Sequence, residues 1–220
     1  ADLLRAVGSL PGVERVRFMS PHPYYVGPRM SQAMAETPAV CPHLHLLLQS
    51  GSDAVLRRMR RNYTAAEYLE KVERLRRAIP GLAISTDVIA GFPGETEADL
   101  EATLSVLEAL DPTFTYCFKF SPREGTEAAE MADGMPEPVK GERLSRLLAL
   151  TEDLQREHLR RKVGRKVRIL LEDETRGRTE DPTRTSTARC LRTERAATVR
   201  RARRISTRAP IAHADRTKAR

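Results

Sequence analysis

The chain lacks any long apolar run. No stretch of its 220 residues approaches the roughly 20 consecutive apolar residues that cross a bilayer. No charged segment followed by an apolar one opens the sequence, so neither a membrane span nor a secretory leader is predicted. These absences make a cytoplasmic location the default expectation, with no membrane partner.

Cysteine is also scarce. The three residues Cys41, Cys117 and Cys190 lie far apart, and an odd count without a close pair argues against a disulfide scaffold. No C-x-x-C pair suggests a metal site, so no metal ligand is predicted in the chain. Each cysteine is therefore interpreted as a small buried apolar residue.

Most of the chain has no excess of positive charge, although the formal net charge of the whole sequence is +8. Residues 176–220 hold 14 Lys+Arg against 4 Asp+Glu, whereas residues 1–175 hold 24 against 26. The basic character thus belongs to the C-terminal segment, and the mildly acidic body needs a separate explanation.

The body alternates short apolar runs with segments of helical period. Such alternation is typical of right-handed βαβ units around a parallel sheet, which predicts the α/β class. The predicted strands are 13–19, 44–49, 82–92, 113–120 and 167–171, and the main predicted helices are 1–10, 29–36, 64–78, 97–110 and 138–161. Asp53 is expected to cap a short helix, and Thr64 with Glu67 to form a capping box.

Two strand-to-helix corners carry the polar residues of interest. At the first corner Gln49 ends an apolar strand, Ser50-Gly51-Ser52 offers backbone N–H groups and hydroxyls, and Arg61 follows within reach of a carboxylate. At the second, Asp87 interrupts an apolar strand ahead of the glycines at 91 and 94. Ligands of parallel α/β folds bind at such strand ends, and a ribose hydroxyl pair would satisfy Asp87.

Simpler interpretations exist for the same residues. A Gly-Ser corner is often only a capped loop, and Arg61 lies in a group of four arginines that is typical of a solvated helix face. His45 lies on a buried strand, and we expect a hydrogen-bonded core residue there instead of a ligand. A general-base role for Asp87 in an ordinary barrel enzyme lacks a second polar partner of the right kind.

Three blocks of the sequence, taken together, resemble a known family. CPHLHLLLQSGSD, ISTDVIAGFPGET and YCFKFSPREGT are similar, in the same order, to the radical S-adenosylmethionine domain of tRNA methylthiotransferases. The resemblance covers residues 10–172. It implies a partial TIM-like (βα) radical SAM barrel, truncated at its N-terminal side, whose strand ends hold S-adenosylmethionine.

The resemblance also implies site residues. Gln49, Arg61 and Asp87 fall on positions that hold the cofactor in a related radical enzyme of haem synthesis, so the two corners would form neighbouring walls of one pocket. The complete predicted cofactor-binding set is Gln49, Ser50, Gly51, Arg61, Asp87, Gly91 and Phe120, the last lying near the adenine; no catalytic residue is assigned.

The sequence departs from the family in two places. The C-x-x-x-C-x-x-C triplet that binds the [4Fe–4S] cluster is absent, so we expect an N-terminally truncated chain whose cluster ligands lie outside it. The predicted organisation is a partial barrel at 1–137, a connecting helix at 138–162, the start of a TRAM-like strand region at 163–175, and a basic, disordered tail at 176–220. A shifted reading frame would explain that tail.

The function implied by the resemblance is insertion of sulfur and a methyl group at C2 of N6-isopentenyl-adenosine in tRNA, with this fragment inactive by itself. The implied partners are tRNA, S-adenosylmethionine and a reductant protein. Two alternatives stay open: a methylthiotransferase acting on threonylcarbamoyl-adenosine, and a non-catalytic RNA-binding module in which the basic tail holds phosphates.

Overall fold

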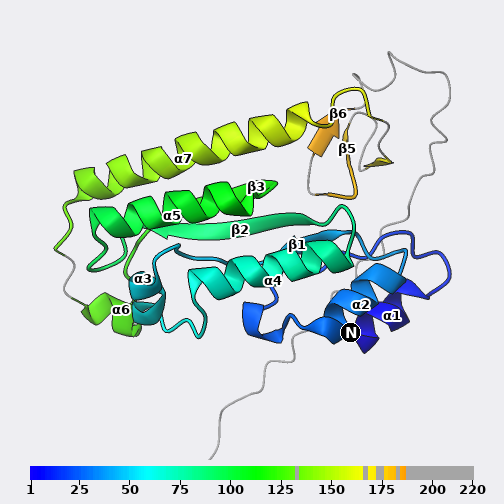
Figure 1. Cartoon of the computed structure of the whole chain (residues 1–220), viewed down its shortest axis with the longest axis horizontal. Helices are drawn as coiled ribbons and strands as arrows, with labels where there is room; N and C mark the ends of the chain where they lie inside the picture. The colour runs from blue at the N-terminus through cyan, green and yellow to red at the C-terminus, as the bar shows by residue number, and fades with distance from the viewer. Residues whose placement is uncertain (132–133, 166–167, 172–175, 182–183, 187–220) are drawn as a thin grey trace, which may run out of the picture.

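The structure, a computed structural model, describes residues 1–131, 134–165, 168–171, 176–181 and 184–186 (Figure 1). A three-stranded sheet lies at its centre, with helices along one side and a second, small sheet near the end of the longest helix. In chain order, the helices and strands are α1 (Asp2–Gly8), the 3-10 helix η1 (Pro23–Tyr25), α2 (Pro28–Glu36), β1 (His43–His45), α3 (Asp53–Arg58), α4 (Ala65–Ala78), β2 (Ala83–Ala90), α5 (Glu97–Leu110), β3 (Phe114–Lys119), α6 (Glu127–Glu130), α7 (Glu137–Arg160), β4 (Leu170–Leu171), β5 (Arg176–Arg178) and β6 (Arg184–Ser186).

The central sheet is parallel, in the order β1-β2-β3. The register pairs His45 with Ser85 and Asp87 with Tyr116. Regular pairing in β1 is shorter than the predicted 44–49 run, but a further parallel bridge joins Gln49 to Val88. The α/β class and the parallel sheet are thereby confirmed.

The predicted strand at 13–19 is reduced to a single parallel bridge between Val16 and Val40, outside the three strands of the central sheet. The predicted strands at 82–92 and 113–120 occur as β2 and β3, within a few residues of their predicted ends. Of the predicted strand at 167–171, Leu170–Leu171 form β4, and residue 167 lies outside the described residues.

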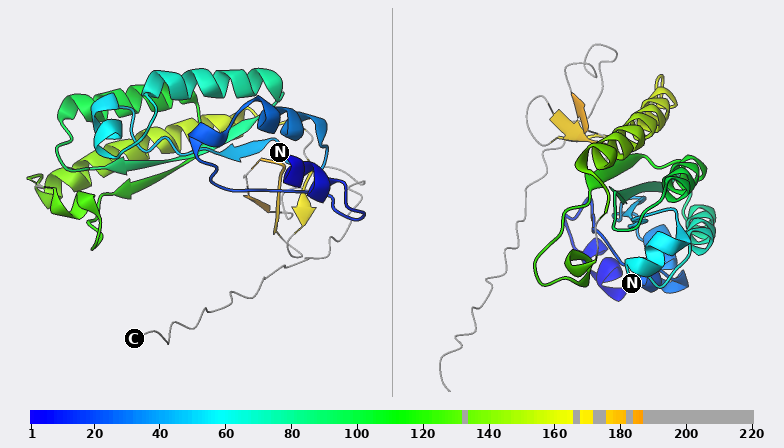
Figure 2. Two further views of the ribbon diagram at one scale, coloured as in Figure 1. Left: turned by 90° about the horizontal axis from the view of Figure 1, so that it is seen from below. Right: turned by 90° about the vertical axis from the view of Figure 1, so that its left-hand side faces the viewer.

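Helices α4, α5 and α7 cover one face of the sheet, as the end-on view in Figure 2 shows. The main core lies between these layers because alternate strand residues point toward the helices. Its fully buried members include Leu44, Leu46, Leu48, Ile84, Leu100, Leu107, Leu110 and Leu147. Burial of this apolar surface contributes about 25 cal/mol per Å² and fixes the sheet against the helices.

Helix starts follow the sequence signals with one correction. The Thr64–Glu67 capping box at α4 is confirmed, with both reciprocal hydrogen bonds present. The prediction that Asp53 caps α3 is wrong: the Ser52 hydroxyl accepts from the Val55 N–H instead. Asp53 stands one residue inside the helix, and its carboxylate accepts from the Ala65 N–H at 2.8 Å, which ties α3 to the start of α4.

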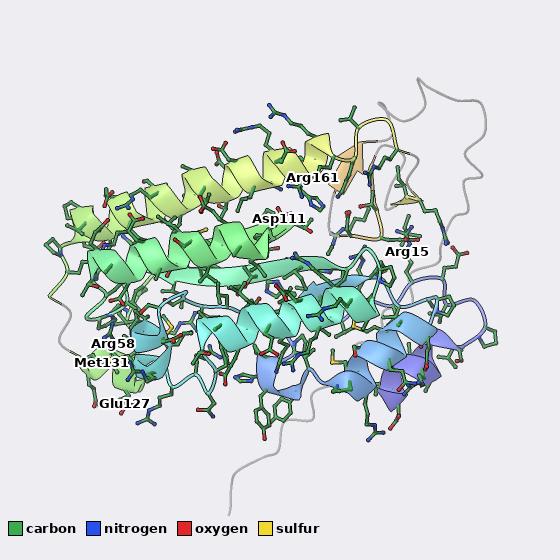
Figure 3. The ribbon with its side chains drawn as sticks, in the orientation of Figure 1. Arg15, Arg58, Asp111, Glu127, Met131 and Arg161 are labelled. Atoms are coloured by element: carbon green, nitrogen blue, oxygen red, sulfur yellow. The ribbon has the colours of Figure 1, made fainter. Side chains whose placement is uncertain are left out.

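A small antiparallel sheet, β4-β5-β6, corrects the expectation of disorder throughout 176–220, because residues 176–178 and 184–186 form strands. The rest of that tail, from residue 187 onward, lies outside the described residues. Arg15, labelled in Figure 3, donates to the Arg178 carbonyl at 2.8 Å, and Arg17 donates to the Glu180 carbonyl at 2.8 Å. The small sheet is thus held by guanidinium groups from the first strand-like segment. No helix in the described ranges is long and apolar enough to span a membrane.

Candidate functional site

The two strand-to-helix corners lie side by side, because the helix that follows the second corner holds the first. Thr103 of α5 accepts the Gly51 N–H at 3.0 Å, and its hydroxyl lies 3.3 Å from that of Ser50. The Ser52 hydroxyl donates to the Asp99 carboxylate at the start of the same helix. A methyl group at Gly51 would lie 2.5 Å from the Thr103 Cα, so glycine is required for this close approach.

Arg58 completes the connection between the corners. Its guanidinium donates to the Gly94 carbonyl at 3.0 Å and lies 3.8 Å from the Asp99 carboxylate. Ser50 and Gly51 therefore face α5 in this arrangement. Their predicted role in cofactor binding stays a prediction.

Gln49 occupies an unusual backbone conformation at the end of the first corner strand. Its φ of 71° lies in the left-handed region, which residues other than glycine rarely adopt. Its N–H donates to the Asp87 carbonyl at 2.8 Å, and its carbonyl accepts from the Ile89 N–H at 2.9 Å. The structure thus brings Gln49 and Asp87 together on neighbouring strands. In the described part of the chain no hydrogen bond is made by the Gln49 side-chain amide.

A row of polar side chains crosses the sheet face opposite α4 and α5. The Ser85 hydroxyl lies 2.9 Å from His43 Nε2 and 2.8 Å from His45 Nδ1. His45 Nε2 lies 3.2 Å from Asp87 Oδ1. Both histidines and the serine are buried, whereas the Asp87 side chain keeps 22% of its surface exposed. The prediction that His45 is a hydrogen-bonded core residue is confirmed.

Electrostatics at Asp87 are set mainly by burial, which raises the pKa of its carboxyl group, and His45 opposes this by lowering it. Oδ1 is shielded from solvent, and although it lies close to His45 Nε2, it forms no hydrogen bond of good geometry within the described ranges. An orphaned buried carboxylate oxygen is costly. A carboxylate has about four acceptor positions, so beyond the His45 contact Asp87 keeps lone pairs for ligand donors.

Aromatic rings continue this face onto β3. Tyr116 stands edge-on to the His45 ring at a centroid distance of 5.8 Å, and its own ring is stacked with that of Phe118 at 6.4 Å. Tyr116 is 46% exposed and Phe118 is 49% exposed, so the rings present an open apolar surface beside the Asp87 carboxylate. A flat ligand of aromatic character would find a matching surface there.

Arg61 lies just beyond α3 and, among the described residues, is connected to Gln49 and Asp87 only through other residues. Its Nε is buried and has no partner in the residues described, and its charge lowers the pKa of Tyr63 against the dominant effect of burial, which raises it. The Tyr63 hydroxyl donates to the Leu47 carbonyl at 2.9 Å, close to Gln49 in the chain. No ion pair joins Arg61 to Asp87 within the described part of the chain.

Gly91 and Phe120 are enclosed by protein. The Gly91 N–H donates to the Glu95 carboxylate at 2.8 Å, and a methyl group at Gly91 would lie 2.7 Å from the Lys140 side chain. The Phe120 ring packs against Phe92 at 5.1 Å, with the Lys140 ammonium 5.9 Å from its centroid. Their predicted contact with a cofactor stays a prediction.

Sequence reasoning missed Glu95 and Arg143. Arg143 of α7 donates to the Glu95 carboxylate at 2.8 Å and to its carbonyl at 3.0 Å, and both side chains are buried. The signal was weak: a glutamate after a Gly-Phe-Pro-Gly corner reads as the start of a helix, and its partner is 48 residues away in the chain. Arg58 was also missed, because a run of arginines reads as a solvated surface.

Metal ligation finds no support in the residues described. No group of three or more His, Cys, Asp or Glu side chains is placed to hold a metal ion there. Cys41 is buried and Cys117 half-buried, and burial raises the pKa of each thiol. Thiols held in the neutral form are poor iron–sulfur ligands, so these cysteines do not fit a [4Fe–4S] cluster. Cys190 lies outside the described residues.

Comparisons with known proteins show which sequences this chain resembles. Residues 2–107 match the Radical SAM superfamily. The chain is 52% identical over 171 residues to the protein named tRNA-2-methylthio-N(6)-dimethylallyladenosine synthase of Mycolicibacterium vanbaalenii, covering 78% of this chain and 34% of that protein. It is 50% identical over 182 residues to the protein of the same name from Salinispora arenicola, covering 80% and 36%. The chain thus spans about a third of the length of the curated relatives it matches.

Among solved structures, the chain is similar to coproporphyrinogen III oxidase (HemN) from Escherichia coli, described as a radical SAM enzyme. The TM-score is 0.53 at 16% identity, over 61% of this chain and 31% of that one. At this identity the likeness shows the fold alone. It agrees with the expected partial barrel.

Proposed function

We propose that this chain, which belongs to the radical SAM superfamily, is part of an enzyme that inserts sulfur and a methyl group at C2 of N6-dimethylallyladenosine (N6-isopentenyl-adenosine) in tRNA. One observation carries the proposal: identity of 50–52% extends over 171 residues or more to proteins named as that synthase. The match to the superfamily ends at residue 107, whereas the matches to the synthases cover more than three quarters of the chain.

The proposed role of this chain is to hold S-adenosylmethionine. Asp87 offers the carboxylate lone pairs that His45 does not occupy to hydroxyl donors, and Gln49 offers a buried side-chain amide on the neighbouring strand. Arg61 would bind a carboxylate group. Its unpartnered Nε does not distinguish it, because the Nε atoms of Arg58 and Arg143 also lack partners among the residues described. When bound beside a reduced cluster, the cofactor supplies hydrogen-abstracting chemistry, and the residues of this chain bind and orient it.

We also propose that the chain alone does not assemble the [4Fe–4S] cluster, because its three cysteines do not form the C-x-x-x-C-x-x-C triplet and burial raises the thiol pKa of Cys41 and Cys117. Reconstitution with iron, sulfide and a thiol reductant is expected to give no cluster absorption band on the purified chain. A stable band accompanied by reductive cleavage of S-adenosylmethionine would contradict this. The implied reductant protein and the cytoplasmic location belong to the same proposal.

The test of the activity uses a chimera. This chain replaces the matching third of the Mycolicibacterium vanbaalenii synthase, and tRNA from cells that depend on the chimera is digested and analysed by mass spectrometry. The expected product is 2-methylthio-N6-dimethylallyladenosine, with an Asp87→Asn chimera as the matched control. Methylthiolated threonylcarbamoyl-adenosine would instead support the rival substrate. Binding of tRNA without any modification would support an RNA-binding module.

A further inference from the structure

A continuous chain of buried polar contacts runs across β1 and β2 and ends at Asp87. It links His43 Nε2 to the Ser85 hydroxyl over 2.9 Å, the same hydroxyl to His45 Nδ1 over 2.8 Å, and His45 Nε2 to Asp87 Oδ1 over 3.2 Å. The first three residues are 3–6% exposed, so water does not compete with these contacts. Neither the superfamily match nor the names of the relatives assigns a role to them.

The number of protons available to Ser85 and the two histidines limits the possible directions of these hydrogen bonds. A serine hydroxyl has one proton, so Ser85 donates to one histidine and accepts from the other. His45 Nε2 faces a carboxylate and must carry a proton there, since two lone pairs 3.2 Å apart would repel each other. If His45 is neutral, its Nδ1 accepts from Ser85, which in turn accepts from His43. If His45 is protonated, the Ser85 hydroxyl turns and donates to His43. In both arrangements Asp87 receives an N–H.

The surroundings leave His45 as the only cationic or proton-donating group in contact with this carboxylate among the residues described. Among the titratable groups of other elements, Tyr116 of β3 lies beside Asp87 on the same face, whereas Cys117 of β3 and Tyr68 of α4 lie on the helix side of the sheet. Asp87 itself raises the pKa of Cys117 and of Tyr68, in both cases as a smaller effect than burial. Tyrosine and cysteine side chains carry no positive charge, so none of these groups balances the Asp87 carboxylate.

We propose that His45 is a positioning residue that, together with Ser85 and His43 behind it, keeps Asp87 ionised and oriented so that its free lone pairs accept a pair of ligand hydroxyls. This rests on the proposed cofactor site, where the hydroxyl pair is that of a ribose. Desolvation favours protonation of the Asp87 carboxylate. The N–H donated by the His45 imidazole stabilises the ionised form instead. Ser85 and His43 hold the ring in the plane and tautomer that this requires.

The test follows the titration of Asp87 directly, in the full chain without cofactor. The chain is labelled with ¹³C at aspartate carboxyl groups, and Asp87→Asn identifies the signal. His45→Leu is expected to raise the pH at which Asp87 titrates by about one unit or more, because an opposing charge at this distance shifts a carboxyl group by 1–3 units. His45→Gln keeps an N–H donor without a charge and is expected to give a smaller rise. His22→Gln, which changes a histidine outside the row, is the control and leaves the titration unchanged.

An unchanged Asp87 titration in folded His45→Gln and His45→Leu would overturn the proposal. Should the leucine variant fail to fold, ¹⁵N spectra of the unaltered chain decide: a neutral His45 with its proton on Nδ1 contradicts the proposal, whereas a proton on Nε2 supports it. Binding of S-adenosylhomocysteine is measured separately, with at least tenfold weakening expected in His45→Leu. If the unaltered chain does not bind this probe but Asp87 still depends on His45, the cofactor assignment fails and the positioning role stands.

Discussion

Replacement of Arg143 by methionine is expected to lower the free energy of unfolding by about 3–5 kcal/mol, the usual cost of removing one partner of a buried ion pair. The Glu95 carboxylate is 1% exposed and Arg143 is 8% exposed, so the remaining charge would have almost no access to water. A loss of this size is a large part of the 5–15 kcal/mol that stabilises a typical domain. The variant therefore tests whether α7 holds the Gly91–Gly94 corner by this contact.

The pH dependence gives the prediction a sign. Burial raises the pKa of Glu95, and the hydrogen bond from Arg143 is the largest opposing effect. Without Arg143 the pKa of Glu95 rises further, and the folded protein then holds a proton that the unfolded chain has released. Stability of the variant consequently falls as pH rises above the ordinary glutamate range. The cost of Arg143→Met should be smaller at pH 5 than at pH 7.

Urea unfolding followed by circular dichroism at both pH values measures this cost. Arg146→Met is the matched control: it lies one turn later on α7, and its ion pairs with Glu97 and Glu101 are exposed, so only a small change is expected. The double variant Glu95→Gln with Arg143→Met keeps an acceptor for the Gly91 N–H without the charge, and should be more stable than Arg143→Met alone. Loss of less than about 1 kcal/mol in Arg143→Met at pH 7 would refute the reasoning.

Three further predictions use the same assay. The pKa of His43 is lowered to about 4, chiefly by burial, so stability should fall by roughly 3 kcal/mol as pH drops from about 6.5 to 4, and His43→Gln should flatten that dependence; equal slopes would contradict it. Gly51→Ala should cost about 1–3 kcal/mol because the new methyl group meets the Thr103 backbone at 2.5 Å; an unchanged midpoint would show that α5 is free to shift. Tyr68→Phe should cost about 1–3 kcal/mol because the buried Leu46 carbonyl loses its 2.7 Å hydrogen bond, and a neutral result would mean that water replaces the hydroxyl.

Local sequence signals predicted the helices and the parallel sheet well. The Thr64–Glu67 box marks the start of α4, and the leucine stripe of α5 recurs with the helical period because such patterns depend only on neighbouring residues. Asp53 was misassigned because two adjacent residues, Ser52 and Asp53, both carry acceptable capping groups. Only the backbone conformation decides between them.

Contacts between distant segments were the part that sequence could not supply. Period-two alternation places His43 and His45 on one face of a strand, but the register that sets Ser85 between them depends on pairing with β2. The partner of Arg143 could not be predicted either, because its contact with Glu95 depends on how α7 packs on the sheet. The sequence predicted that the Asp87 carboxylate needs a donor, but it did not identify His45 as the neighbour that lies 3.2 Å away.

The left-handed backbone at Gln49 separates the demands of folding from those of ligand binding. A side chain in that region costs about 1–3 kcal/mol that glycine would avoid, while both backbone hydrogen bonds to β2 would survive the exchange. Stability alone therefore favours glycine at this position. Under the proposed cofactor site, ligand contacts of the Gln49 amide would offset this cost, so Gln49→Gly should stabilise the fold while weakening cofactor binding.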